Sequence, residues 1–239
     1  MRRVLKALGR KAGSRVRVHG AAKPAAASVD AALLRARAAA AMRALDVGEY
    51  ALDLWLADDA WMRSLNRGYL QKDYATDVLS FPYAHENGDG AQAAPVAGKV
   101  PAASHRADAR LGDVMVGLAA ARAATSARSE TANVPGEQVA RGRGCYGRLY
   151  AAPDATPLAL DDVCWLLAVH GICHLLGYTH DDELSTATMI DAEEKALEAA
   201  ASAGAIIKPG SSHTETAPHP TESDHAARLQ RLDLDGSPE

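Results

Sequence analysis

Apolar residues in the first half of the chain follow helical and strand spacing in turn. Residues 31–45 carry a loose apolar stripe among alanines, which are strong helix formers, and so predict a helix. Residues 50–56 alternate between apolar and other side chains, as a strand with one buried face does. Helical spacing returns over residues 60–69, and residues 76–82 predict a short strand that ends at a proline.

The second half of the chain predicts one further strand and three helices. Residues 111–118 predict the strand, and residues 119–129 predict the helix that follows it. Residues 161–176 are apolar on nearly every side, which is typical of a helix inside the core. The last helix is predicted over residues 183–201, with its apolar positions facing inward.

Two internal stretches and the C-terminal end show no sustained hydrophobic period. Residues 84–110 and 130–156 are irregular, and we expect them to be inserted loops. Residues 208–239 are dominated by Pro, Ser, Thr, His and charged residues, which predicts a disordered tail. The sequence therefore predicts one folded domain over residues 30–207 with two insertions.

The N-terminal segment is strongly basic. Residues 1–29 contain eight Lys or Arg and no Asp or Glu, a composition typical of a mitochondrial transit peptide. Residues 15–18 also alternate in polarity and predict a first strand of the domain, and the two interpretations are compatible. We therefore expect a mitochondrial location, with the cytoplasm as the alternative.

The charge of the remaining chain limits its partners. Setting aside the eight basic residues of the first segment leaves 18 Lys or Arg against 30 Asp or Glu, a net charge of −12. An acidic body argues against broad, non-specific binding of nucleic acid, so any contact with RNA would have to be local. Arg141, Arg143 and Arg148 form a small basic group that we interpret as a solvated loop rather than an RNA contact.

The cysteines indicate the redox state of the compartment, and the hydropathy indicates whether the chain contacts a membrane. Cys145, Cys164 and Cys173 are odd in number and form no Cys-x-x-Cys pair, which favours a reducing compartment. No run of residues approaches the roughly 18 consecutive apolar positions of a membrane span. We therefore expect no membrane partner.

The candidate chemistry is concentrated in one histidine motif near the end of the predicted core helix. His170 and His174 are four residues apart, so they lie one turn apart on the same face of a helix. Gly177 can adopt the left-handed conformation that ends a helix, which would let the chain return with His180 as a third ligand. Three histidines with an open fourth position are typical of a catalytic zinc site, where a bound water has a pKa of about 7.

The same spacing occurs in the metzincin peptidases, with one difference. Their HExxHxxGxxH motif has a glutamate after the first histidine, and this glutamate is the general base of peptide hydrolysis. Gly171 occupies that position here, so the sequence favours a metal site and disfavours a metallopeptidase. Cys173 lies about 100° around the helix axis from His174, and we expect it in the core rather than among the ligands.

Three segments together resemble the YbeY endoribonuclease family of ribosomal RNA maturation factors. The histidine motif is similar to the family's HGxLHLxGYDH signature, with Cys173 for its leucine and Thr179 for its aspartate. Residues 65–82 resemble its LNxxYR…TDVLSFP block, and residues 111–114 resemble its LGDI strand. One departure concerns the arginine of the second block, since Leu70 occupies that position.

The resemblance implies both a fold and a function. The fold would be α/β (α+β), a small mixed sheet packed by helices, with one Zn²⁺ per chain held by His170, His174 and His180. The activity would be cleavage of single-stranded RNA in small-subunit rRNA maturation and ribosome biogenesis. The implied protein partners are small ribosomal subunit proteins or assembly factors.

Residue chemistry suggests how such an enzyme could work. Zinc would acidify water or polarise a phosphoryl oxygen, and a carboxylate would orient or deprotonate the nucleophile, because Gly171 cannot. Asp113 and Asp181 are the two catalytic candidates, whereas Asp77 is expected to make structural hydrogen bonds near its turn. The alternative function is a non-catalytic, zinc-containing ribosome assembly factor, which Leu70 and the acidic body favour.

Overall fold

A computed structural model describes six stretches of the chain, and most of the predicted elements lie within them. The basic residues 1–14 and the predicted tail 208–239 lie outside the described residues, as do parts of both predicted insertions. The described stretches are residues 15–20, 28–83, 96–100, 109–126, 143–150 and 158–204.

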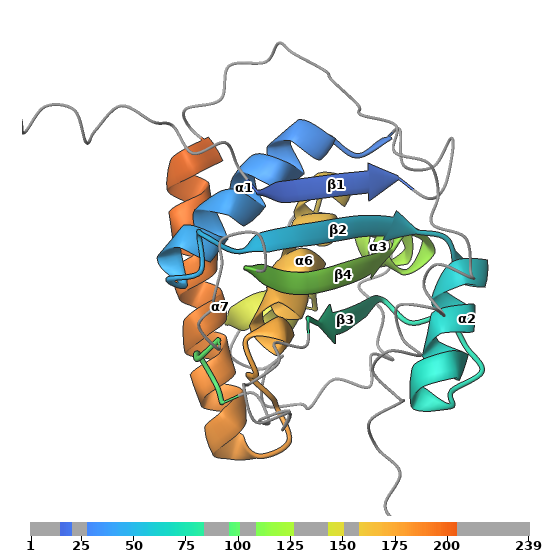
Figure 1. Ribbon diagram of the computed structural model, residues 1–239. Helices are drawn as coiled ribbons and strands as arrows, with labels where there is room; N and C mark the ends of the chain where they lie inside the picture. The colour runs from blue at the N-terminus through green and yellow to red at the C-terminus, as the bar shows by residue number, and fades with distance from the viewer. Residues whose placement is uncertain are drawn as a thin grey trace, which may run out of the picture.

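A mixed four-stranded sheet organises the fold (Figure 1). Its strands are β1 (Val16–Gly20), β2 (Ala51–Ala57), β3 (Val78–Pro82) and β4 (Arg110–Gly117), arranged in the order β1-β2-β4-β3. β1 and β4 run parallel to β2, whereas β3 runs antiparallel to β4 at the other edge. The predicted small mixed sheet is confirmed, and the alternating residues at the N-terminal end form an edge strand within it.

Six helices surround the sheet within the described residues. Each predicted helix is present with bounds within three residues of those expected from the sequence. One prediction was wrong in part, because a short helix lies inside the stretch 130–156 that we expected to be irregular. The helices are α1 (Ala31–Ala44), α2 (Asp59–Leu70), α3 (Leu118–Ser126), α5 (Gly144–Leu149), α6 (Leu160–Leu175) and α7 (Glu183–Gly204).

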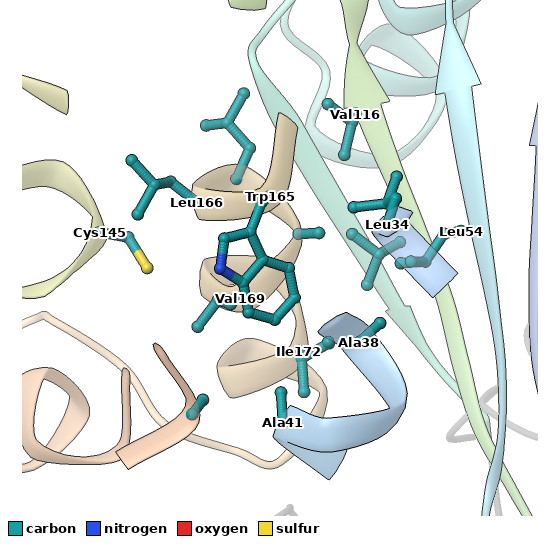
Figure 2. Packing of buried hydrophobic residues seen from close by; sticks show 14 of the residues in the cluster. Leu34, Ala38, Ala41, Leu54, Val116, Cys145, Trp165, Leu166, Val169 and Ile172 are labelled. Carbon is teal, nitrogen blue, oxygen red and sulfur yellow. The ribbon is translucent and has the colours of Figure 1, made fainter. Parts of the chain in front are cut away.

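The two faces of the sheet carry different layers. Side chains of β2 and β4 such as Leu54 and Val116 face a large core that includes α1, α3, α6 and α7 (Figure 2). The alternate side chains, such as Trp55 and Met115, pack with Met62 of α2 in a second, smaller cluster. Because successive side chains of a strand point to opposite faces, these two sets define opposite sides of the sheet.

Alanine lets the helices of the main layer approach one another closely. Ala38 and Ala41 of α1 are fully buried, and so is Ala196 of α7, the helix against which α1 packs. Small side chains at such an interface bury little area each but allow close contact between backbones. Cys173 is also fully buried, which confirms that it belongs to the core. None of the described helices is long and apolar enough to cross a membrane.

A buried carboxylate ties the edge strand β1 to the sheet on the face where α2 packs. Asp53 of β2 is 3% exposed and accepts hydrogen bonds from Arg17 Nη2 at 2.6 Å, His19 Nε2 at 2.7 Å and Arg110 Nη2 at 3.1 Å. Burial alone raises the pKa of Asp53, but the hydrogen bonds from His19 and Arg17 outweigh it and lower the pKa from 3.8 to about 2. The ionised form therefore stabilises the folded state.

Acid and the Asp53→Asn substitution are both expected to weaken the fold through this carboxylate. A depressed folded-state pKa gives stability that is present above pH 3.8 and is lost as the pH falls through about 2. The shift corresponds to about 2 kcal/mol, and Asp53→Asn should cost about 2–3 kcal/mol at pH 7. Urea unfolding of both proteins at pH 7 and pH 3 measures this. Equal stability of the two proteins at pH 7 would contradict the assignment.

Candidate metal centre

Helix α6 and the turn that follows it bring three histidines together. His170 and His174 lie one turn apart on α6, and their Nε2 atoms are 3.0 Å apart. His180 follows the turn, and one ring nitrogen from each of the three histidines lies within 4.8 Å of the others. The three residues predicted as metal ligands thus form one cluster, His170–His174–His180.

The turn that returns His180 to the helix depends on Gly177. Gly177 has a φ of 78°, in the left-handed region that glycine adopts without steric cost. Its N–H donates to the carbonyl of His174 at 2.9 Å, and the N–H of Tyr178 donates to the carbonyl of Cys173 at 3.1 Å. The end of α6 is therefore capped in the way that the sequence predicted.

Hydrogen bonds at Nδ1 orient two of the imidazoles. Nδ1 of His174 donates to the carbonyl of Tyr178 at 2.9 Å, and Nδ1 of His170 donates to Oε1 of Glu193 at 2.8 Å. A proton on Nδ1 leaves the Nε2 lone pair free to bind a metal ion. Burial, together with the neighbouring His170, lowers the pKa of His174 to about 4, which keeps this ring in its neutral, ligating form.

Glu193 is a site residue that the sequence analysis missed. It lies on α7, it is 3% exposed, and its carboxylate contacts a ligand histidine from 23 positions further along the chain. One signal was available, since Glu193 lies four residues after Met189 and four before Leu197, on the buried stripe of the helix. An acidic residue on an apolar stripe usually has a buried partner.

The two predicted catalytic carboxylates have different positions. Asp113 of β4 is 6% exposed and accepts a hydrogen bond from Trp55 Nε1 at 3.0 Å. It therefore points to the α2 face of the sheet, whereas α6 packs on the opposite face. The structure does not bring Asp113 beside the histidines, and its catalytic role stays a prediction. Asp181 follows the third histidine directly and is exposed, and its role stays a prediction.

Comparison with known proteins identifies the family. The sequence model described as Endoribonuclease YbeY matches residues 23–136 and 151–201. The chain belongs to the YbeY endoribonuclease family. A similar protein from Anaeromyxobacter dehalogenans, named Endoribonuclease YbeY, is 34% identical over 74% of this chain and 68% of its own length.

Two further relatives extend this similarity across wide evolutionary distance. The Endoribonuclease YbeY of Rhodopseudomonas palustris is 33% identical over 72% of this chain and 69% of its own length. The human protein of the same name is 27% identical over 69% of this chain and 77% of its own length. The family resemblance of the three sequence segments is therefore confirmed by matches that span most of the chain.

Packing explains why this YbeY-family chain has glycine after the first histidine. A Cβ on Gly171 would lie 2.5 Å from Val114 Cγ1 and 3.0 Å from Ser80 Oγ, because α6 packs directly on β4 and β3 there. The hydroxyl of Ser80 also donates to the carbonyl of Gly171 at 3.0 Å. A glutamate at this position would point into the sheet and not toward the histidines, so the metallopeptidase hypothesis is further disfavoured.

Helix α5 places a tyrosine against the histidine cluster. The Tyr146 ring lies edge-on to His170 with ring centroids 4.4 Å apart, and its hydroxyl donates to Asp77 Oδ2 at 2.8 Å. Asp77 Oδ1 accepts from the N–H of Val78 at 2.9 Å, which confirms its predicted structural role. Burial and the nearby Asp77 raise the pKa of Tyr146 well above its usual value, so the phenol stays protonated as a donor.

Two arginines of the predicted basic group form ion pairs between α7 and the segment that contains α5. Arg143 pairs with Asp191 at 3.0 Å, and Arg148 pairs with Glu194 at 2.6 Å, both on α7. These ion pairs hold α5 against α7 and reduce the positive charge available to a ligand. Arg141 lies outside the described residues.

Proposed function

We propose that this protein is a zinc-dependent, single-strand-specific endoribonuclease that acts in small-subunit rRNA maturation. The observation that carries the proposal is the cluster of His170, His174 and His180, with two of the imidazoles oriented through Nδ1. The name shared by the relatives supports RNA as the substrate. Small ribosomal subunit proteins or assembly factors are the proposed protein partners, and the basic N-terminal segment supports a mitochondrial location.

The donor set of the site fits zinc. Neutral imidazole is a preferred ligand of Zn²⁺, and three such ligands leave a position open for water or substrate. Zinc bound there would supply a Lewis acid to an attacking water and to a phosphodiester oxygen. The chain itself orients two of the three imidazoles, those of His170 and His174, through their Nδ1 atoms. Asp181, beside the third ligand, is the carboxylate that we propose to orient the attacking water.

Removal of the metal provides the direct test of this function. The zinc-loaded protein should cleave an end-labelled single-stranded RNA and leave the same RNA intact when it is annealed to its complement. Treatment with a chelator should abolish cleavage, and one equivalent of Zn²⁺ should restore it, because the open metal position is needed for the reaction. Cleavage that continues in protein shown by elemental analysis to be metal-free would overturn the proposal.

One observation favours a second function, a non-catalytic zinc-containing assembly factor. Leu70 is the last residue of α2, is 52% exposed, and occupies the position where the family pattern has an arginine. A leucine cannot form the paired hydrogen bonds that an arginine makes to phosphate. A folded, zinc-containing protein that binds pre-ribosomal particles but cleaves no RNA would support this alternative.

A further inference from the structure

We propose that Glu193 is a positioning residue, which fixes His170 in its metal-binding form and docks helix α5 beside the site with the same carboxylate. Metal affinity and the placement of α5 are then coupled through one side chain. The inference rests on the proposed metal site, and it adds a residue to that site from a different helix.

Both oxygens of the Glu193 carboxylate act as acceptors. Oε1 accepts from Nδ1 of His170 at 2.8 Å, and Oε2 accepts from the backbone N–H of Cys145 at 2.7 Å. Both side chains of the first pair are 4% exposed, so water does not substitute for either partner. A carboxylate satisfies two donors at once, whereas the side-chain amide of glutamine offers one acceptor oxygen and an NH₂ group that only donates.

The charge of Glu193 points to a cation beyond the imidazole. Among the described residues, no Lys or Arg forms an ion pair with this buried carboxylate, and its donors are a backbone amide, a ring N–H and the thiol of Cys145. A buried charge is stable in a protein when it is paired or acts with a metal ion. A divalent ion on Nε2 of His170 would supply that balance across the ring, as a carboxylate–histidine–metal arrangement does.

The backbone at the start of α5 lies close to the carboxylate of Glu193. Gly144 has a φ of 71°, and a Cβ at this position would lie 2.6 Å from Oε2 of Glu193. The N–H groups at the start of a helix have no partner within the helix, and here Glu193 and its neighbour accept two of them. The helix docked in this way carries Tyr146, whose ring contacts His170.

Glu194 provides a matched control on the adjacent position. Its Oε1 accepts from the N–H of Gly144 at 2.7 Å, and its Oε2 accepts from Arg148 Nη2 at 2.6 Å. It therefore holds the same end of α5 as Glu193 does but is not hydrogen-bonded to a histidine. Glu194→Gln weakens the docking of α5 alone, whereas Glu193→Gln leaves one acceptor oxygen for the two donors, His170 Nδ1 and the N–H of Cys145, and removes the negative charge beside His170.

The test measures metal binding without RNA. Metal-free wild-type, Glu193→Gln and Glu194→Gln proteins are titrated with Co²⁺, followed by the visible absorption of the bound ion, and with Zn²⁺ against a competing chelator. We expect Glu193→Gln to bind 10–100-fold more weakly, roughly the loss seen when such a partner is removed, with an altered Co²⁺ spectrum. Glu194→Gln should bind within about twofold of wild type.

Each outcome decides the inference separately from the proposed function. A folded Glu193→Gln protein with wild-type affinity would overturn it, as would an equal loss in Glu194→Gln, since docking of α5 would then explain the effect. If far-UV circular dichroism shows that Glu193→Gln does not fold, Glu193→Asp replaces it, and an affinity no weaker than that of Glu194→Gln overturns the inference. A wild-type protein that binds neither ion would instead refute the zinc dependence of the proposed function.

Discussion

Replacing His174 with alanine is expected to remove the bound metal and abolish RNA cleavage while the fold stays intact. His174 supplies one of three ring nitrogens to the cluster, and the loss of one of three ligands leaves two imidazoles, too few for a tightly held Zn²⁺. The substitution removes one hydrogen bond, from Nδ1 to the carbonyl of Tyr178, at a cost of about 1 kcal/mol. Zinc content per chain, cleavage of single-stranded RNA and the far-UV circular dichroism spectrum measure the three effects.

His19→Ala is the control for a general effect of losing a histidine. His19 stacks on Trp55 with ring centroids 3.9 Å apart and binds Asp53, on the sheet face opposite to α6. Its loss should lower stability but leave the zinc content and the cleavage rate at wild-type levels. A His174→Ala protein that lacks zinc and still cleaves RNA would show that the metal cluster is not the catalytic site.

The histidine cluster could be predicted from the sequence because its geometry is local. His170 and His174 share a helix face by their spacing alone, and Gly177 supplies the turn that brings back His180. These relations follow from the spacing within eleven residues, His170 to His180, and predicting them requires no knowledge of contacts with the rest of the chain. The same local logic placed most helices and strands within a few residues of their observed bounds.

The position of Asp113 could not be derived in the same way. Successive residues of a strand point to opposite faces, but β4 is buried on both, so its hydrophobic pattern does not say which face meets α6. The packing of Gly171 on Val114 and the hydrogen bond from Trp55 to Asp113 together show that Asp113 points to the other face of the sheet. The family motif at residues 111–114 thus drew attention to Asp113 but did not show to which face of the sheet its side chain points.

The role of Glu193 and the existence of α5 depend on tertiary contacts, which the local hydrophobic pattern of the sequence does not show. A helix as short as α5 is not stable by itself, and here hydrogen bonds and ion pairs from α7 hold it in place. The sequence around it consequently resembles a loop. Tyr146 and Cys145 lie about 25 positions before His170 in the chain. For the same reason, the sequence did not show that these two residues lie next to the site.

Replacing Gly112 with alanine is expected to be among the most destabilising single changes in this protein. Gly112 has a φ of 146°, and its missing Cβ leaves room for the backbone carbonyl of Phe81 on the neighbouring strand β3, with which a methyl group would collide. Leu175 Cδ2 of α6 would be 3.0 Å away on the same side. Backbone strain and the displaced strand together should cost about 3 kcal/mol or more, measured by urea unfolding.

Gly68→Ala is the matched control, because the added methyl group meets nothing within 4 Å. Gly68 lies inside helix α2, where alanine is favoured over glycine, so this variant should be more stable than wild type by about 0.5–1 kcal/mol. The opposite signs separate the steric effect at Gly112 from a general response to glycine substitution. Because β3 and β4 both pack against α6, Gly112→Ala should also lower the zinc content. A Gly112→Ala protein with wild-type stability would mean that β3 does not pair with β4 in this register.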